Sequence, residues 1–212
     1  MKLQNKYKNE RIEVARFMKR LYKHGLTTTS GGNISWRLND ELIIITPSAT
    51  DKGRMKWKEV GIMSILGENL TPWLKPSIEY AFHLNIYKKR KDVTAIVHAH
   101  PVFASSFTAM KSEINTSLTA EARAICGQPL FVPYALMGSE ELAEIVSEKS
   151  NNADILLLEN HGILTTGTDL LKAFDKLEVL ENAAKMTLIV EMRGKKRMLS
   201  PARIREIDRL FR

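Results

Sequence analysis

The chain has 212 residues, of which 44% are hydrophobic and 26% charged, and its formal net charge at pH 7 is +8. Such a length and composition are typical of one globular domain with a sizeable core, so we expect a single domain over residues 1–212. No apolar run approaches the ~20 residues needed to cross a bilayer. The N-terminal segment has no apolar stretch of the kind found in secretory signals. The only cysteine, Cys126, excludes an internal disulfide, so we expect a cytoplasmic protein without membrane partners.

The excess positive charge lies near the two ends of the chain and in the run KKRK at 88–91. A strongly basic chain can bind nucleic acid, but both ends also have helical periodicity, which is typical of solvated helix faces. The sequence has no zinc-finger spacing, no RNP-like aromatic pattern and no low-complexity basic tail. We therefore expect no nucleic-acid partner, and a cationic surface also suits small phosphorylated molecules.

Apolar residues recur along the chain with the period of helices and of strands in alternation. In chain order, the pattern predicts a helix over 12–22, strands near 34–38, 42–46 and 60–66, a helix over 77–90, a strand over 93–98, a short helix from Pro101, a helix up to 149, strands over 155–159 and 163–166, and helices over 168–192 and 201–210. Strands outnumber those of a simple βαβ repeat. We therefore expect an α/β fold with a mixed central sheet and helices on both sides.

Two histidines end the predicted core strand in AIVHAHPVFA (95–104). Alternate residues of a strand project from one face, so His98 and His100 point together. This pair alone leaves a metal site and a structural role equally open. His161 follows the apolar strand ILLLE and precedes Gly162, at the kind of strand end where functional groups cluster. Three neutral imidazoles with an open position are typical of catalytic zinc, whereas structural zinc usually has four protein ligands.

The segment KPSIEYAFH (75–83) adds a carboxylate near these histidines. Glu79 is expected one turn inside the helix next to the strand of His98, as a metal ligand, a base, or only a glutamate that the helix dipole stabilises. His83 lies four residues later on the same helix face, where a hydrogen-bonded structural histidine is commoner than a ligand or its partner. His24, at the end of the first long helix, is expected to be structural.

Three loops carry residues that suit a phosphate group. TTTSGGNIS (27–35) has consecutive glycines, and TPSAT (46–50) and KPS (75–77) have hydroxyls and loop amides. They match neither a P-loop nor a GxGxxG fingerprint, and serines and threonines in loops usually form turns. The spacing alone therefore leaves both interpretations open.

The segments GGNIS, ITPSAT, KPSIEYAFH, AIVHAHP and ENHGIL occur in this order along the chain. In this combination, over about residues 10–190, the sequence resembles the class II aldolase/adducin family and, within it, the fuculose-phosphate aldolases. The resemblance implies a three-layer αβα sandwich with a mixed, largely antiparallel central sheet. It also implies a homotetramer with active sites at the subunit interfaces.

The resemblance further implies one Zn²⁺ per chain, held by His98, His100 and His161. Glu79 matches a glutamate that ligates the resting metal and then moves a proton. The implied reaction cleaves a ketose 1-phosphate, of the L-fuculose 1-phosphate type, reversibly to dihydroxyacetone phosphate and an aldehyde. The positions that match phosphate-binding residues of the family are Gly32, Asn33, Ser48, the Ala49 amide and Ser77.

Two departures from the family pattern concern the substrate. Ile78 stands where a second small polar residue is frequent, and residues 115–129 lack the tyrosine that acts on the aldehyde from a neighbouring subunit. Glu121 is the nearest acid in that stretch, either a second catalytic residue or a surface residue. Dehydration, epimerisation and decarboxylation of a sugar phosphate therefore remain alternatives. A non-catalytic adducin-like interaction domain is less expected, because such a surface needs no set of three histidines and Glu79.

Overall fold

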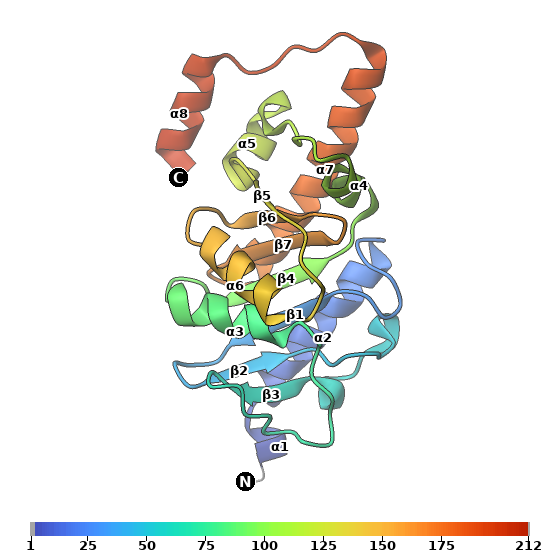
Figure 1. Cartoon of the computed structure of the whole chain (residues 1–212), viewed down its shortest axis with the longest axis vertical. Helices are drawn as coiled ribbons and strands as arrows, with labels where there is room; N and C mark the ends of the chain where they lie inside the picture. Colours follow the sequence, from blue (N-terminus) through green and yellow to red (C-terminus); the bar gives the residue numbers. More distant parts are fainter. Residues whose placement is uncertain (1–2, 212) are drawn as a thin grey trace.

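The structure of the chain, a computed structural model, describes residues 3–211. A seven-stranded sheet lies at its centre with the strand order β3-β2-β1-β4-β7-β6-β5 (Figure 1). Every neighbouring pair is antiparallel except β5 and β6, which are parallel. The prediction of a mixed, largely antiparallel sheet is thus confirmed. The strands are β1 (Asn33–Arg37), β2 (Leu42–Ile45), β3 (Gly61–Ser64), β4 (Ala95–Ala99), β5 (Leu130–Val132), β6 (Ile155–Leu158) and β7 (Gly162–Gly167).

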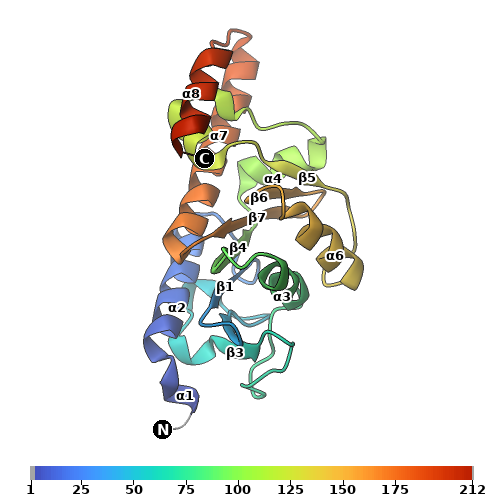
Figure 2. The same cartoon turned by 90° about the vertical axis from the view of Figure 1, so that its left-hand side faces the viewer.

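Helices cover both faces of the sheet, as expected for an αβα sandwich (Figure 2). On one face lie α2 (Lys8–Lys23) and α7 (Leu170–Arg193), and on the other lie α3 (Tyr80–Lys89) and α6 (Glu140–Lys149). The remaining elements are α1 (Leu3–Lys6), α4 (Val102–Met110), α5 (Ala120–Cys126), α8 (Pro201–Phe211) and the short 3₁₀ helices η1 (Lys52–Arg54), η2 (Trp57–Glu59) and η3 (Thr116–Leu118). Among the described residues, no helix is both long and apolar enough to cross a membrane.

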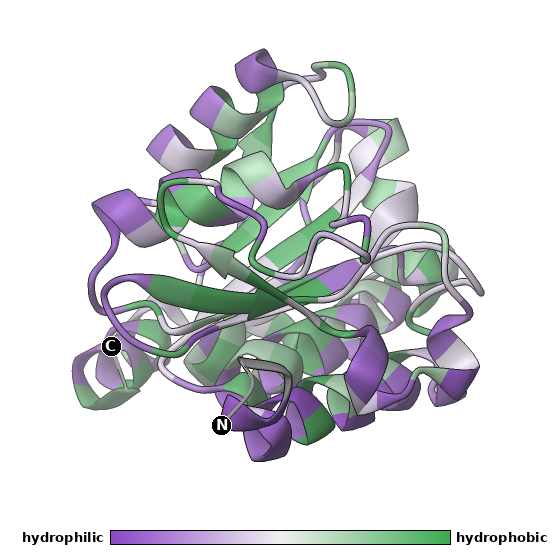
Figure 3. Ribbon diagram, turned by 90° about the horizontal axis from the view of Figure 1, so that it is seen from below, coloured by the Kyte–Doolittle hydropathy of each residue, from purple (hydrophilic) through white to green (hydrophobic). Residues whose placement is uncertain are grey.

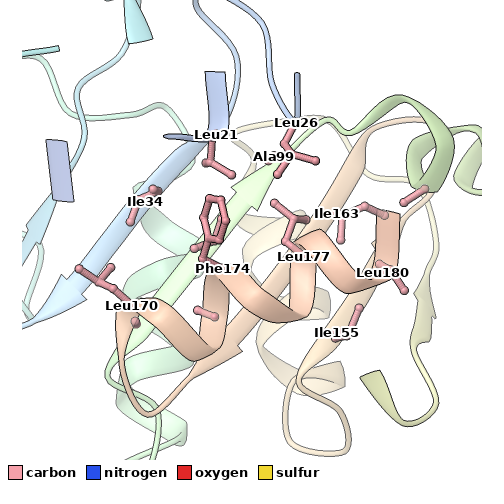
Figure 4. Packing of buried hydrophobic residues seen from close by; sticks show 14 of the residues in the cluster. Leu21, Leu26, Ile34, Ala99, Ile155, Ile163, Leu170, Phe174, Leu177 and Leu180 are labelled. Atoms are coloured by element: carbon pink, nitrogen blue, oxygen red, sulfur yellow. The ribbon is translucent and has the colours of Figure 1, made fainter. Parts of the chain in front are cut away.

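The alternation of side chains along the strands makes two hydrophobic cores, one on each face. On β2, Ile44 packs into the α2 and α7 core, while Ile43 and Ile45 pack into the α3 and α6 core. Figure 3 shows hydrophobic residues along the strands and hydrophilic ones on the outer turns of the helices. In the first core, Phe174 and Leu177 of α7 face the sheet beside strand residues such as Ile163 (Figure 4).

This alternation decides on which face the histidines lie. On β4, Val97 and Ala99 belong to the α2 and α7 core, and Ile96 belongs to the α3 and α6 core. His98 has the same parity as Ile96 and therefore points toward the face that α3 covers. The N-terminal end of α3 lies next to His98, and the fold therefore places Glu79 beside His98.

Most predicted elements agree with the structure, but the helix that was expected to contain Glu79 begins later than predicted. The expected helix over 77–90 begins at Tyr80, so Glu79 is its N-cap residue and does not lie one turn inside the helix. The reason is local. Pro76 forms a β-bridge with Pro47, and the Ser77 carbonyl and hydroxyl accept hydrogen bonds from the amides of Tyr80 and Glu79, which makes a turn there. The sequence pattern also missed α5 and β5.

Candidate metal centre and its base

Three histidines converge at one end of the central strands. The ring centroids of His98 lie 4.8 Å from those of both His100 and His161, and those of His100 and His161 are 5.5 Å apart. Each ring offers a nitrogen within 4.8 Å of the other two. The Nε2 atoms of His98 and His100 are only 3.1 Å apart. These nitrogens surround one point, as ligands of a single ion do, and the pairing predicted for His98 and His100 is confirmed.

Strand pairing explains how distant residues meet here. β4 and β7 are antiparallel neighbours, with His98 opposite Leu164 and Ala99 opposite Ile163. His161 occupies the tight turn between β6 and β7, where its amide donates to Leu158. A Cβ on the following residue, Gly162, would lie 2.5 Å from Cδ2 of His100 and 2.7 Å from the carbonyl oxygen of Ala99. Only glycine leaves room for the His100 ring at this place.

Burial of His98 and His100 favours the neutral imidazole, which is the form that binds metal. Nδ1 of His98 lies 2.9 Å from the carbonyl oxygen of Ile163 and donates to it, which leaves the Nε2 lone pair free toward the cluster. Burial lowers the pKa of His98. Burial, together with the neighbouring histidines, lowers the pKa of His100 to about 3.

Glu79 completes the cluster from the start of α3. Its Oε1 lies 3.0 Å from Nε2 of His161 and its Oε2 lies 3.3 Å from Nε2 of His98, and the side chain is buried. Burial works against ionisation, but His98, His161 and a hydrogen bond from Asn33 together hold the pKa of the Glu79 carboxyl well below its usual range. Glu79 is therefore an anion at neutral pH.

The donor set of this cluster fits a divalent metal ion. Oε1 of Glu79 is buried and accepts no hydrogen bond from the described residues, although it faces His161. A buried anionic oxygen beside three imidazole nitrogens is the combination that binds Zn²⁺ and several other first-row metals. The residues present thus fit the zinc ion that the resemblance of the sequence implies.

Of the predicted phosphate residues, Gly32, Asn33 and Ser77 lie beside this cluster. Asn33 pairs with His98 across β1 and β4, and its Nδ2 donates to Oγ of Ser77 at 2.9 Å and to Oε2 of Glu79 at 2.8 Å. The Ser48 amide donates to the carbonyl of Lys75, which holds the loop of Ser48 and Ala49 against that of Ser77. Gly32 has a φ of +68°, and a Cβ there would lie 2.7 Å from the His98 carbonyl.

Glu121 lies elsewhere in the chain. It is an exposed residue in the first turn of α5, a helix whose main contacts are with α7, α8 and η3. Figure 1 shows these helices gathered at the end of the molecule opposite the N-terminus. In the part of the chain that the structure describes, Glu121 is thus not among the residues around Glu79.

Sequence reasoning missed two buried hydroxyl residues next to this site. Ser35 Oγ lies 2.7 Å from Nδ1 of His83 and 2.8 Å from the hydroxyl of Tyr87. His83 is the buried, hydrogen-bonded helix histidine that was expected. Ser35 lies at its Nδ1 atom, and Asn33 lies at its Nε2 atom. The available signal was the pair of polar residues, Asn33 and Ser35, on one face of an otherwise apolar strand.

Comparisons with known proteins agree with this site. The family described as Class II Aldolase and Adducin N-terminal domain matches residues 12–188. An L-fuculose phosphate aldolase from Methanococcus vannielii is 36% identical over 170 residues, which cover 80% of this chain and 91% of that protein. A 3-oxo-tetronate 4-phosphate decarboxylase from Haemophilus influenzae is 33% identical over 192 residues, covering 88% of this chain and 90% of that protein.

Comparison with solved structures also shows a close similarity of fold. One L-fuculose 1-phosphate aldolase superposes with a TM-score of 0.88 at 29% identity, and the match covers 96% of both chains. Aldolases and decarboxylases are both lyases, so the curated relatives differ in the bond that they break beside a carbonyl group and not in enzyme class. With most of its length matched and the cluster of three histidines in place, the chain belongs to the class II aldolase and adducin family.

Proposed function

We propose that the chain is a zinc-dependent lyase that cleaves a ketose 1-phosphate, of the L-fuculose 1-phosphate type, reversibly to dihydroxyacetone phosphate and an aldehyde. One observation carries this proposal. The Glu79 carboxylate lies 3.0 Å from His161 and 3.3 Å from His98, and it accepts a hydrogen bond from Asn33. A single base therefore touches the metal ligands on one side and the proposed phosphate residues on the other.

In the proposed reaction, different residues of the chain would bind the phosphate and transfer the proton. The phosphate would be held so that the bond to be broken lies over the three histidines. Glu79, which is ionised at neutral pH, would take up or return the proton at the hydroxymethyl carbon of dihydroxyacetone phosphate. When bound, Zn²⁺ supplies positive charge that stabilises the negative charge developing on the substrate oxygens. The groups proposed to hold the phosphate are Gly32, Asn33, Ser48, the Ala49 amide and Ser77.

The proposal includes an assembly. We propose one Zn²⁺ per chain and a homotetramer in which each site lies between subunits, with Glu121 of one chain acting on the aldehyde end of its neighbour's site. The exposure of Glu121 and its distance in the fold from the elements of the cluster are consistent with such a role. The cytoplasm is the proposed location, which a sequence with a single cysteine suits.

Proton exchange tests the proposal without any knowledge of the aldehyde. Zinc-loaded protein is mixed with dihydroxyacetone phosphate in D₂O, and the hydroxymethyl protons are followed by NMR. We expect stereospecific exchange of one proton, and we expect Glu79→Gln to abolish it. The absence of exchange from zinc-loaded wild-type protein contradicts the aldolase assignment.

Decarboxylation of a 3-oxo sugar-acid phosphate is the second candidate, and two observations favour it. The decarboxylase from Haemophilus influenzae matches a longer part of this chain than the aldolase from Methanococcus vannielii does, 192 residues against 170. Loss of carbon dioxide also needs no acid toward an aldehyde, and residues 115–129 contain no tyrosine. Release of carbon dioxide from such a phosphate, without proton exchange on dihydroxyacetone phosphate, supports this alternative.

A further inference from the structure

A continuous chain of buried polar side chains extends from the base into the protein. Asn33, Ser35, His83 and Tyr87 are each at most 2% exposed, and Glu79 is 6% exposed. From the site inward, Asn33 Nδ2 lies 2.8 Å from Glu79 Oε2, His83 Nε2 lies 2.5 Å from Asn33 Oδ1, Ser35 Oγ lies 2.7 Å from His83 Nδ1, and the Tyr87 hydroxyl lies 2.8 Å from Ser35 Oγ. The side-chain polar atoms of Asn33, Ser35, His83 and Tyr87 all have hydrogen-bond partners.

The fold explains why these five side chains meet. Glu79, His83 and Tyr87 follow one another at intervals of four residues and therefore share one face of α3 and its N-cap. Asn33 and Ser35 are two apart on β1 and share one face of the strand. The helix face and the strand face interlock, so the side chains alternate between the two elements.

The chemistry of the partners determines the direction of the hydrogen bonds on both sides of His83. A carboxylate and an amide oxygen only accept, so Nδ2 of Asn33 donates to Glu79 and Nε2 of His83 donates to Oδ1 of Asn33. Nδ1 of His83 then lacks a proton and accepts from the Ser35 hydroxyl, and the Tyr87 hydroxyl lies within hydrogen-bond distance of both Ser35 Oγ and the Thr94 carbonyl oxygen. Burial, which raises the pKa of Tyr87 and lowers that of His83 to about 3, keeps both groups in the neutral forms that this direction needs.

One side-chain amide therefore depends on His83 for its orientation. The amide of Asn33 has two orientations related by a half-turn, and only one presents NH₂ hydrogens to Glu79 and to Ser77. The reverse orientation would turn Oδ1 toward an anionic carboxylate and toward the place proposed for the substrate phosphate. The proton on Nε2 of His83 excludes that reverse orientation, because it would face the NH₂ group of Asn33.

We propose that His83 is a positioning residue of the site, which locks the Asn33 amide with its NH₂ group toward the Glu79 carboxylate and toward Ser77. The phosphate of the substrate would replace Oγ of Ser77 as the acceptor of the second NH₂ hydrogen. This inference rests on the proposed function in one respect, the phosphate that Asn33 binds. His83 touches neither the substrate nor the three metal-binding histidines through hydrogen bonds; it acts through Asn33.

Three variants separate positioning from simple stabilisation. His83→Phe keeps an aromatic ring next to Phe82, on which His83 is stacked, and removes both hydrogen bonds. His83→Gln returns an N–H donor near the position of Nε2. Tyr87→Phe removes the hydrogen bond between Tyr87 and Ser35, the one farthest from the site, and leaves Asn33 held by His83. If His83 only stabilises the fold, His83→Phe and Tyr87→Phe should weaken phosphate binding equally. If His83 positions Asn33, only His83→Phe should weaken it.

Two measurements on the zinc-loaded, full-length protein use these variants. The first is the affinity for inorganic phosphate, by calorimetry. We expect His83→Phe to weaken it roughly ten- to a hundredfold, the range for one hydrogen bond to a charged group. His83→Gln should restore most of the affinity, and Tyr87→Phe should keep it. The second is ¹⁵N NMR of the Asn33 side-chain NH₂ group, whose slow hydrogen exchange in the wild type should be lost in His83→Phe alone.

Each outcome decides the inference. Unchanged phosphate affinity and a protected Asn33 amide in His83→Phe contradict it, as does an equal loss in His83→Phe and Tyr87→Phe that follows their melting temperatures. A wild-type protein that binds no phosphate also overturns it. If the wild type binds phosphate with the expected pattern but exchanges no proton of dihydroxyacetone phosphate, the aldolase assignment fails and the role of His83 stands.

Discussion

Nδ1 of His98 donates a hydrogen bond to the carbonyl oxygen of Ile163, 2.9 Å away on the neighbouring strand β7. Because that oxygen can only accept, the proton of the imidazole stays on Nδ1 and the lone pair of Nε2 points toward His100 and His161. The central sheet thus selects the tautomer that binds a metal ion. The same contact holds the ring in place before any metal arrives.

The first prediction concerns the metal itself. Wild-type protein should contain about one zinc per chain after dialysis, as one open catalytic site implies, and His98→Ala should lose it because one of three nitrogen ligands is gone. Metal content by atomic emission measures this. His24→Ala is the matched control, since His24 lies at the end of α2 and pairs with Glu178 at 2.7 Å. A folded His98→Ala protein that keeps stoichiometric zinc contradicts the assigned centre.

The second prediction concerns the base. Glu79→Gln keeps the shape of the side chain and an oxygen that can accept from Asn33, so circular dichroism should be unchanged. Proton exchange on dihydroxyacetone phosphate should fall by roughly 10²- to 10⁴-fold, the usual contribution of a general base. Exchange at the wild-type rate in Glu79→Gln removes Glu79 from that role.

The third prediction uses the close approach of Gly162 to His100. In Gly162→Ala the new Cβ would lie 2.7 Å from the carbonyl oxygen of Ala99 and 2.5 Å from the His100 ring, so the ring has to move. Zinc affinity, measured by competition with a chelator, should fall roughly ten- to a hundredfold, as when a group that orients a ligand is changed.

The control for this variant is Gly194→Ala at the end of α7. Gly194 has open space around it and a φ of +68°, so alanine there strains the backbone without touching the cluster. It should lower the melting temperature and keep the zinc affinity. Equal zinc affinity in Gly162→Ala and Gly194→Ala contradicts the packing argument.

Local patterns of the sequence predicted those features of this site that are local. The spacing of His98 and His100 follows from the period of a strand, and Gly162 after His161 indicated a strand end where functional groups cluster, whereas the crowding at Gly162 became visible only in the structure. The pairing of β1 with β4, which sets Asn33 opposite His98, joins segments far apart in the chain, and periodicity does not report strand order. The link from Asn33 through His83 to Ser35 depends on that pairing and was therefore missed.

The elements that sequence reasoning missed are short. β5 has three residues and α5 has seven, too few for either period to become visible. The beginning of α3 was wrong for a different reason: Pro76 and Ser77 are typical at a helix start, but here they form a turn that bonds to the neighbouring loop. Glu79 consequently caps the helix, and its carboxylate turns toward the histidines.

The fourth prediction is acid sensitivity of the metal-free protein. Burial lowers the pKa values of His83 and His100 to about 3, against 6.5 in an unfolded chain. Between these values the unfolded state binds more protons than the folded state, so the free energy of unfolding falls as the pH falls. Each group contributes a slope of up to about 1.4 kcal/mol per pH unit in this window. The depressed pKa of Glu79 acts in the same direction.

Denaturant titrations between pH 7 and pH 4 measure this slope. His83→Gln should make the slope shallower, because it removes one group that titrates only in the unfolded chain. A stability that is flat over this range in the wild type contradicts the neutral, buried state of these histidines.

The last prediction tests whether Glu121 acts across a subunit interface. If the acid comes from the neighbouring chain, Glu79→Gln and Glu121→Gln should each be inactive in cleavage, while mixed oligomers of the two should regain activity. In random one-to-one assembly, half of the chains supply an intact Glu79 and half of their neighbours supply an intact Glu121, so about a quarter of the sites should recover. Cleavage by co-expressed, differently tagged chains measures the recovery. No recovery contradicts a role of Glu121 in the site of a neighbouring chain, and full activity of Glu121→Gln alone identifies Glu121 as a surface residue of α5.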